Sequence, residues 1–352
     1  MNDLHDGGVD ALKLRLPAEW EMGGGVILAW PHPETDWNYM LDDVRACVVE
    51  MIHAISRWTR VVVLAPDIAA ARREIGTADP EKVFFFETPT NDTWTRDYGP
   101  LSVELSDGSF AALDFRFNGW GLKFAACHDN LVTGRMSRSG LIGSPVVNCQ
   151  DFVLEGGGIE SDGNGLLMTT SECQCSPNRN PVLDRDGIEK RLLGYFGAEK
   201  IIWLNHGYLA GDDTDSHIDT LARFAPGNTI IFTGCDDPSD EHFSELQAME
   251  AELRDARDLS GNPFNLIRLP LPDAIYDEDG ERLPATYANF LALPDVVLMP
   301  VYEQPKKDEL ARQMLQIAFH QPVVAIDCRA LIRQHGSLHC MTMQFPDGML
   351  SF

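Results

Sequence analysis

Short apolar runs recur from one end of the chain to the other, each only a few residues long and bounded by polar or turn-forming residues. Runs of this length that are rich in Val, Ile, Leu and Phe predict β-strands. We predict strands at Val26–Trp30, Val61–Ala65, Ala111–Phe115, Leu166–Thr170, Ile201–Leu204, Thr229–Phe232, Val296–Pro300 and Val323–Asp327. Several of these runs are apolar at nearly every position, so we expect the sheets to be covered on both faces.

Longer segments between some of these strands repeat apolar residues at helical spacing. In the first such segment a single stripe carries Val44, Val48, Met51, Ile52 and Ile55, as in an amphipathic helix. We predict helices over Leu41–Trp58, Asp184–Tyr195, Asp240–Arg257 and Lys306–Phe319, with Pro238 and Ser239 as the start of the third.

The order of these elements indicates an α/β fold, but not a doubly wound sheet. Strands often come in pairs before a helix, and no phosphate-binding loop follows the first strand. Gly156-Gly157-Gly158 has neither the G-x-G-x-x-G spacing of a dinucleotide site nor the lysine of a Walker loop. No linker or change of composition divides the chain. We therefore predict one domain over residues 1–352, built from several similar β/α units around an axis.

Composition agrees with a globular protein, because 44% of the 352 residues are hydrophobic. No run approaches the ~18 apolar residues of a membrane span, and the first residues lack the basic and apolar regions of a secretory signal. The eight cysteines are too scattered for a disulfide framework, so we expect reduced thiols and a cytoplasmic protein. Cys173-x-Cys175 is a weak metal signal without a second ligand pair, and buried thiols are the better interpretation.

The charge is strongly negative, with 54 acidic against 28 basic residues and a formal net charge of −26. Such a surface disfavours binding to nucleic acid and to anionic membranes, and it mildly favours cationic ligands.

Four polar clusters interrupt the apolar pattern. The segment Asp215-Ser216-His217-Ile218-Asp219-Thr220 places a histidine and a carboxylate on one face if it is extended, because side chains alternate in a strand. By itself this His-x-Asp pattern fits two metal ligands, an acid/base pair or a polar loop. The other three clusters are Asn91–Pro100, which follows the apolar run Val83–Phe86, then Glu155–Gly158, and Gly336–Thr342, which contains a cysteine. Three consecutive glycines after Glu155 suggest a close approach of the backbone.

The combination of a cysteine, a histidine and several carboxylates restricts the chemistry. A Cys–His pair alone suggests acyl transfer, but carboxylates around the site would oppose the negative charge that develops on an oxyanion. A guanidinium substrate is instead stabilised by carboxylates, because its planar fork of N–H donors matches them. Its central carbon remains open to attack by a thiolate. Among Cys/His chemistries, substitution at a guanidine fits this set best.

The motifs resemble those of the agmatine deiminase and bacterial (Porphyromonas-type) peptidylarginine deiminase family, within the guanidino-group-modifying pentein superfamily. The resemblance runs nearly end to end and in order. Its motifs are Pro17-Ala18-Glu19-Trp20, Leu28-Ala29-Trp30-Pro31, Asn91-Asp92-x-Trp94-x-Arg96-Asp97-x-Gly99-Pro100, Leu154-Glu155-Gly156-Gly157-Gly158-Ile159, Asn178-Arg179-Asn180-Pro181, Asp213-Thr214-Asp215-x-His217-Ile218-Asp219, Tyr287-x-Asn289-Phe290 and His339-Cys340. It implies a five-bladed α/β propeller of ββαβ-type units with a central active site.

The resemblance also implies a role for each matching residue. Cys340 would be the nucleophile and His217 the general acid/base. Asp97 and Asp219 would hold the guanidinium, and Glu155 would lie between His217 and the substrate nitrogens.

Further residues near these motifs receive other interpretations. Trp94 would form a wall of the substrate pocket, whereas Arg96 and Arg179 would organise their loops. Trp120 is interpreted as a core aromatic. His339 is disfavoured as a second base, because neighbouring residues of a strand face opposite ways.

The chain departs from the family pattern at Glu160-Ser161, at Ser216 and at Met343. We expect these residues to contact the part of the substrate beyond the guanidinium. They would then determine which substrate is bound and leave the reaction mechanism unchanged. Free arginine would need an arginine for its α-carboxylate, whereas agmatine is a dication that suits the acidic chain and acidic loops such as Asp273–Glu281.

The sequence thus predicts a hydrolase without metal or cofactor that converts agmatine to N-carbamoylputrescine and ammonia through a covalent thiouronium on Cys340. Peptidylarginine is the second candidate substrate and free arginine the last. An amidinotransferase and a non-catalytic guanidine-binding protein are the alternatives of other classes. The expected partner is a small cationic guanidine, with no nucleic acid or membrane, and a homo-oligomer is left open.

Overall fold

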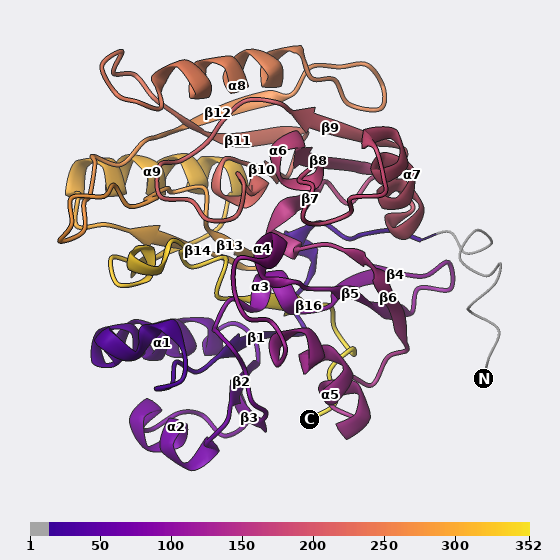
Figure 1. Cartoon of the computed structure of the whole chain (residues 1–352), viewed down its shortest axis with the longest axis vertical. Coiled ribbons are helices and arrows are strands. Elements are labelled where there is room, and N and C mark those ends of the chain that lie inside the picture. The colour runs from indigo at the N-terminus through magenta and orange to yellow at the C-terminus, as the bar shows by residue number, and fades with distance from the viewer. Residues whose placement is uncertain (1–13) are drawn as a thin grey trace.

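Five small sheets surround a common centre in the computed structural model, which describes residues 14–352 (Figure 1). Four of the sheets have three strands each, in which an antiparallel pair is followed by a helix and a parallel third strand. The strands of these units are β4 (Leu101–Glu104), β5 (Phe110–Arg116) and β6 (Val146–Val153); β7 (Ile159–Ser161), β8 (Leu166–Thr170) and β9 (Lys200–Leu204); β10 (Ala222–Ala225), β11 (Thr229–Gly234) and β12 (Asn265–Pro270); β13 (Leu291–Leu293), β14 (Val296–Val301) and β15 (Val323–Asp327).

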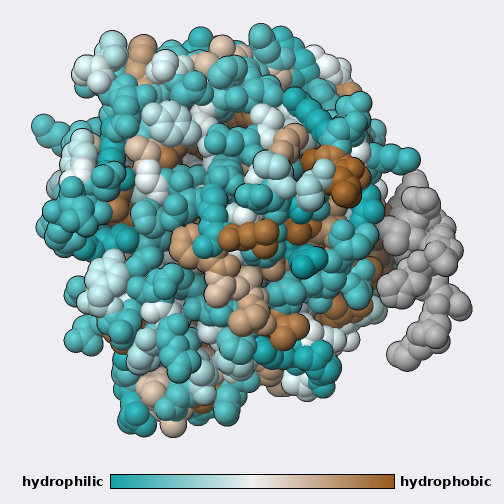
Figure 2. Space-filling view, viewed as in Figure 1, coloured by the Kyte–Doolittle hydropathy of each residue, from teal (hydrophilic) through white to brown (hydrophobic). Residues whose placement is uncertain are grey.

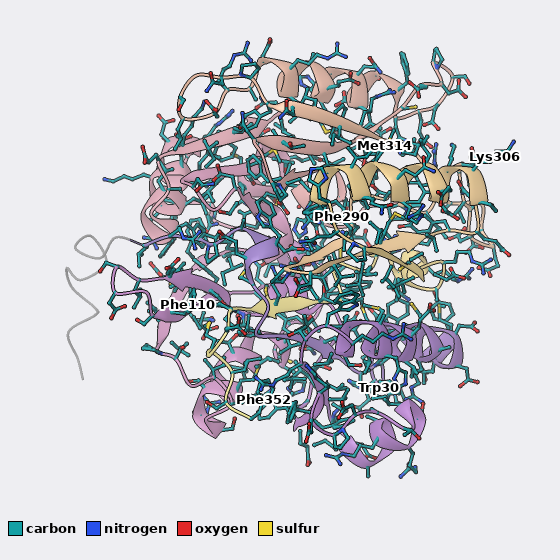
Figure 3. The ribbon with its side chains drawn as sticks, turned by 180° about the vertical axis from the view of Figure 1, so that it is seen from behind. Trp30, Phe110, Phe290, Lys306, Met314 and Phe352 are labelled. Carbon is teal, nitrogen blue, oxygen red and sulfur yellow. The ribbon has the colours of Figure 1, made fainter. Side chains whose placement is uncertain are left out.

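The helices that connect the parallel strands cover the outer side of these sheets (Figure 1). They are α5 (Val132–Ser139), α7 (Arg185–Phe196), α8 (Phe243–Asp255) and α9 (Pro305–Phe319). The short helix α6 (Ser171–Gln174) directly follows β8 and lies nearer the centre of the molecule (Figure 1). Seen from behind, α9 lies on the outside of the last unit with Lys306 at its solvent-facing end, while Phe290 packs beneath it (Figure 3). The ring centroids of Phe290 and Phe319 are 5.5 Å apart.

The first sheet is built from both parts of the chain. Its strands are β1 (Gly25–Ala29), β2 (Val61–Ala65) and β3 (Val83–Glu87), with α1 (Leu41–Ser56) and α2 (Ile68–Ile75) between them. These three strands are parallel, and β16 (Met343–Phe345) pairs antiparallel with β1 through Gly25 and Phe345, Val26 and Gln344, and Ile27 and Met343. The late strand thus closes the ring of units by occupying the place that the antiparallel first strand has in the other four.

Burial explains why these segments form strands and helices. All five residues of β1 and of β2 are buried, which accounts for their uniformly apolar sequence. The stripe of α1 from Val44 to Ile55 is fully buried, and burying each such side chain contributes about 1.5–3 kcal/mol. The ends of α7 are equally explicable, because Asp184 caps the first turn through the Gly187 N–H and Gly197 ends the helix in the left-handed conformation.

The predicted α/β class and its five-unit arrangement are confirmed. Every strand and helix predicted from the apolar pattern is present, with ends that differ by a few residues. One helix start is wrong, because α8 begins at Phe243 after His242 and not at Pro238 and Ser239. The strands that were not predicted are the short strands β4, β7, β10, β13 and β16, together with the longer β3, β6 and β12.

The visible face of the molecule is largely polar, as the net charge of −26 leads one to expect, with a few apolar groups near its centre (Figure 2). Over residues 14–352, no helix combines the length and the hydrophobicity that crossing a membrane requires.

Candidate active site

Four loops from different units bring the predicted site residues together at the centre of the ring. Asp97 belongs to the short helix α3 (Thr95–Tyr98), and Glu155 precedes the 3-10 helix η5 (Gly156–Gly158). His217 precedes the 3-10 helix η6 (Ile218–Thr220), which contains Asp219, and Cys340 lies in a turn just before β16. All five side chains are at most 6% exposed. In Figure 1, α3 lies at the centre of the view, where the sheets converge.

His217 and Asp219 do not lie in an extended segment, so that prediction is wrong. Asp215 and Ser216 have φ values of 64° and 61°, and the chain then enters η6. The two side chains nevertheless approach the same point, which is marked by Gly157. A Cβ atom at Gly157 would meet His217 Nδ1 at 2.8 Å, Asp97 Oδ1 at 2.9 Å and Asp219 Oδ2 at 3.1 Å. The glycine run is therefore a close approach of the backbone to the site, as predicted.

Asp97 is held in one orientation by two donors. The Gly157 N–H donates to its Oδ1 over 3.0 Å, and the Trp120 indole N–H donates to its Oδ2 over 2.9 Å. Burial raises the pKa of Asp97, and the positive charge of His217 opposes this. Trp120 is thus buried as expected, but its hydrogen bond makes it more than a core aromatic.

The backbone around Trp120 is unusual. The turn α4 (Gly119–Leu122) has positive φ at all four residues, including 53° at Trp120 and 71° at Leu122. Left-handed conformation costs an L-residue about 1–2 kcal/mol, and such strain is typically kept where function requires it. Here it directs the indole N–H at Asp97.

His217 is enclosed by carboxylates without a close hydrogen bond. Its Nδ1 lies 3.7 Å from Asp97 Oδ1 and its Nε2 lies 3.8 Å from Glu155 Oε2. Neither ring nitrogen has a hydrogen-bond partner among residues 14–352. Burial by itself would lower the pKa of His217, but the charge of Asp97 and further neighbours raise it well above its usual value. These neighbours therefore favour the protonated form of His217 more strongly than water does.

Glu155 is fixed from the opposite side by Arg179. The Arg179 Nε lies 2.8 and 3.1 Å from the two Glu155 oxygens, one terminal nitrogen lies 2.6 Å from Asp215 Oδ2, and the other donates to the Thr214 carbonyl over 2.8 Å. Burial would raise the pKa of Glu155, but the Arg179 charge keeps it below its usual value. Arg179 organises this loop, as expected.

Asp219 is oriented by a residue that the sequence interpretation set aside. His339 donates from Nδ1 to Asp219 Oδ2 over 2.7 Å, and its Nε2 lies 2.6 Å from Glu19 Oε2. Each ring nitrogen of His339 thus faces a carboxylate, and these two contacts fix the orientation of the ring. Asp219 Oδ1 has no partner within residues 14–352, so it is left for a ligand. The prediction that His339 and Cys340 lie in a strand and so face opposite ways is wrong, because residues 338–341 form a turn.

Cys340 lies beside Asn289 and Asp219. The Asn289 side-chain N–H donates to Cys340 Sγ over 3.2 Å and to Asp219 Oδ2 over 3.1 Å, while its carbonyl accepts the His339 N–H over 2.9 Å. Burial and the nearby charges of Asp219 and Asp97 raise the pKa of Cys340 well above its usual value. In the free protein this group is a thiol.

A buried charge network behind the site explains the departures from the family pattern. Arg223 forms an ion pair with Glu160 and another with Glu19, the latter over 2.8 Å, and the Arg96 guanidinium donates to Gln344 Oε1 over 2.5 Å. Arg96 therefore organises its surroundings, as expected.

The residues at which the chain departs from the family pattern lie outside the active-site cavity. Glu160 belongs to this network, Met343 pairs with Ile27 in the first sheet, and Ser216 donates to Glu172 over 3.0 Å. None of them, nor Ser161, lines the cavity at the active site. The prediction that these positions contact the rest of the substrate is wrong.

The cavity above the site has a volume of about 510 Å³ including its open mouth, within the range of small-molecule sites. His217, Cys340, Trp94 and Trp120 lie on its wall, while Asp219 and Glu155 lie below it. Its acidic residues are Asp36, Asp92, Asp97, Asp212 and Asp213, and among residues 14–352 no lysine or arginine lines it. The acidic segment Asp273–Glu281 does not reach the cavity, in contrast to our expectation.

The ring of five ββαβ units places the chain in the pentein fold class. A dimethylarginine dimethylaminohydrolase structure matches it with a TM-score of 0.51 at 14% identity, over 92% of this chain and 100% of that one, which establishes the fold alone. Residues 15–346 match the model of the Porphyromonas-type peptidyl-arginine deiminase family. An agmatine deiminase of Pseudomonas syringae pv. tomato is 32% identical over 94% of this chain and 95% of that protein.

Solved structures agree with this assignment. A C. jejuni agmatine deiminase with substrate bound has a TM-score of 0.89 at 36% identity, over 96% of this chain and 97% of that one. A Porphyromonas gingivalis protein provisionally assigned as an arginine deiminase has a TM-score of 0.91 at 47% identity, over 96% and 100%. The chain belongs to the Porphyromonas-type peptidylarginine deiminase and agmatine deiminase family, and it is an agmatine deiminase-like hydrolase.

Three residues that hold the site together were not predicted to contact the site residues. Asn289 and Glu19 stand in the motifs Tyr287-x-Asn289-Phe290 and Pro17-Ala18-Glu19-Trp20, and a polar residue inside such a motif was the available signal. Trp120 lies in Asn118-Gly119-Trp120-Gly121, where an aromatic between two glycines marks unusual backbone.

Proposed function

We propose that this protein hydrolyses agmatine to N-carbamoylputrescine and ammonia. The observation that carries the proposal is the cavity, which combines Cys340 and His217 at its base with five aspartates and, within residues 14–352, no cationic side chain except histidine. Agmatine has a guanidinium at one end and an ammonium at the other. A cavity of this charge suits a dication and provides nothing for an α-carboxylate.

The guanidinium fits between Asp97 and Asp219. Asp97 is fixed by Gly157 and Trp120, and Asp219 presents its unpartnered Oδ1. Burial, Asp219 and Asp97 together raise the pKa of Cys340, and binding the cation offsets the two negative charges, so the thiol releases its proton to solvent through the cavity as the substrate arrives. The nucleophile is thereby generated only in the complex.

His217 then serves both halves of the reaction. The Cys340 thiolate attacks the central carbon, and the His217 imidazolium gives a proton to the departing amine, which leaves as ammonia. The thiouronium on Cys340 is attacked by a water from which the neutral His217 takes a proton. Collapse of that adduct expels the Cys340 sulfur, which takes up the remaining hydroxyl proton and returns as the thiol, and leaves the neutral ureido product. The two steps thus replace one difficult displacement.

The ammonium tail is expected to lie at the outer part of the cavity among Asp36, Asp92, Asp212 and Asp213. Burial raises the pKa of Asp92 to about 7, with a further contribution from Asp36. An ammonium beside Asp92 would therefore favour its ionised form, and the tail and the carboxyl group would stabilise one another.

The experiment compares agmatine with pentylguanidine, in which a methyl group replaces the ammonium. An ion pair of about 1 kcal/mol corresponds to roughly fivefold in affinity. Asp213→Asn should raise KM for agmatine by about that factor and leave KM for pentylguanidine unchanged. Asp186→Asn, at an exposed position of α7, is the matched control and should alter neither. Equal effects on the two substrates would contradict the tail assignment.

Peptidylarginine is the second candidate, because the matching family model is described as a peptidyl-arginine deiminase. Ammonia release from agmatine, L-arginine and a blocked peptidylarginine, in one buffer and at one salt concentration, distinguishes the candidates. If kcat/KM for L-arginine or the peptide equals or exceeds that for agmatine, the proposal is wrong. Turnover that requires an acceptor amine would indicate an amidinotransferase.

A further inference from the structure

A second thiol, that of Cys173, lies close to His217 but does not line the cavity. Cys173, on α6, is fully buried, and its sulfur lies within 4.8 Å of a Glu155 oxygen and of a His217 ring nitrogen. The mechanism uses His217 and Cys340 but has no task for Cys173. Cys175, the other cysteine of the Cys173-x-Cys175 pair, is exposed and does not belong to this group. The interpretation of both cysteines as buried thiols is therefore wrong for Cys175.

The atoms of this group that could bind a metal ion have no strong hydrogen bonds that would compete with it. His217 Nε2, which is 3.8 Å from Glu155 Oε2, has no hydrogen-bond partner among residues 14–352 although the ring is fully buried. The only donor to Cys173 Sγ in that range is the Gln174 amide at 3.8 Å, a weak contact. A second cluster of similar composition, Glu19 with Glu160 and His339, differs because Arg223 already occupies its ligands.

We propose that Cys173, Glu155 and His217 form a binding site for a thiophilic divalent cation such as Zn²⁺, and that the bound metal inhibits the enzyme. A thiolate, an imidazole and a carboxylate are typical zinc ligands, with bonds of about 2.0–2.3 Å in tetrahedral geometry. Such bonds place a nitrogen and an oxygen ligand about 3.4 Å apart, so the 3.8 Å between His217 Nε2 and Glu155 Oε2 needs to shorten by only a few tenths of an ångström.

The charges around the site favour a cation. Asp97 and Asp219 lie near His217, and among the arginines and lysines of residues 14–352 only Arg179 forms an ion pair with Glu155. Arg179 Nε contacts both Glu155 oxygens, so one oxygen can turn to the metal while the other stays on Arg179. Binding requires Cys173 to lose its proton and His217 to be neutral, so it releases protons and strengthens with rising pH.

Occupancy of this site would stop catalysis by a defined route. The metal takes the Nε2 lone pair of His217, which can then neither protonate the leaving amine nor accept a proton from water. Mg²⁺ should not act in the same way, because it prefers oxygen ligands in octahedral geometry.

The first experiment measures binding without turnover. Chelator-treated Cys340→Ala protein should bind one equivalent of Zn²⁺ in calorimetry, and Co²⁺ should give a thiolate-to-metal charge-transfer band. Cys173→Ser in the Cys340→Ala background should lose the band and weaken Zn²⁺ binding at least tenfold, whereas Cys149→Ala, at another buried thiol, should change neither. Melting curves check that each variant is folded.

The second experiment measures inhibition with whichever guanidine the enzyme turns over. Zn²⁺ should inhibit reversibly, with full recovery in chelator, and Cys173→Ala should need at least tenfold more metal for half inhibition. The inference is overturned if Cys340→Ala abolishes Zn²⁺ binding, which would place the metal on the nucleophile, or if no stoichiometric binding occurs. Neither outcome depends on agmatine being the substrate.

Discussion

Replacement of Asp97 by asparagine tests the guanidinium site most directly. The substitution keeps the shape of the side chain and removes its charge. In the free protein Asp97 Oδ1 accepts from Gly157 and Oδ2 from Trp120, so the amide of asparagine must direct its N–H₂ at one of two donors. Asp97→Asn therefore loses both the ion pair with the substrate and one of the bonds that orient the side chain.

The size of the effect follows from burial. Asp97 is 3% exposed, and truncating one partner of a desolvated charge pair costs about 2–5 kcal/mol. At about 1.4 kcal/mol per decade this is a loss of roughly 30- to several-thousand-fold in kcat/KM. Stability should not fall in parallel, because burial already raises the pKa of Asp97 and the neutral amide relieves its repulsion with Asp219 and Glu155.

The assay is steady-state ammonia release from agmatine, with urea unfolding of the same samples. Trp120→Phe is the matched variant, because it removes one donor to Asp97 and keeps the charge. A hydrogen bond to a charged group contributes about 1.5–3 kcal/mol, so this variant should lose at least about tenfold in kcat/KM. If Asp97→Asn retained kcat/KM within threefold of the unmodified enzyme, Asp97 would not be the partner of the guanidinium.

Three other outcomes are expected. Cys340→Ala should remain folded and bind agmatine without detectable turnover. In the unmodified free enzyme, iodoacetamide should label Cys340 slowly at neutral pH and faster in alkali, because the pKa of this thiol is raised well above its usual value. Rapid labelling at a rate independent of pH would contradict this. Glutamine in His339→Gln cannot reach both Asp219 and Glu19, so one buried carboxylate loses its hydrogen-bond partner. This should lower the free energy of unfolding by about 1–3 kcal/mol and kcat/KM at least tenfold, and unchanged values of both would exclude the positioning role. Burial raises the pKa of Asp92 to about 7 and that of Asp129 to about 8. Between these values and about pH 4, where the same groups ionise in the unfolded chain, the folded state therefore binds more protons than the unfolded state. The free energy of unfolding should fall as pH rises from about 4 to about 8, and a rise over that range would contradict the assignment.

The apolar strands could be predicted from the sequence because burial on both faces leaves a continuous signal. In β1 and β2 every residue is buried, and each is an uninterrupted apolar run in the sequence. The short strands β7 and β10 were missed because Glu160 and Arg223 interrupt them. Those two residues are buried as an ion pair, and a pairing between distant segments leaves no mark in the local pattern.

The candidate site was accessible to sequence analysis for a different reason. Cys340, His217 and the carboxylates are chemically specific residues in ordered motifs, so their types restricted the reaction before any geometry was known. The partners of these residues were not accessible in this way. The bond from Trp120 to Asp97 depends on a left-handed turn, and the contact of Glu19 with His339 joins segments from opposite ends of the chain.

The closing strand β16 determines when activity can first appear during synthesis. Domains generally begin to form from the N-terminal side as the ribosome extends the chain, yet Cys340 follows every other residue of the site in the sequence, and its turn is fixed by the pairing of β16 with β1. A nascent chain that has released four complete units still has neither the nucleophile nor a closed ring. Premature termination between Asp327 and Cys340 would therefore yield a protein with most of its core but without its nucleophile.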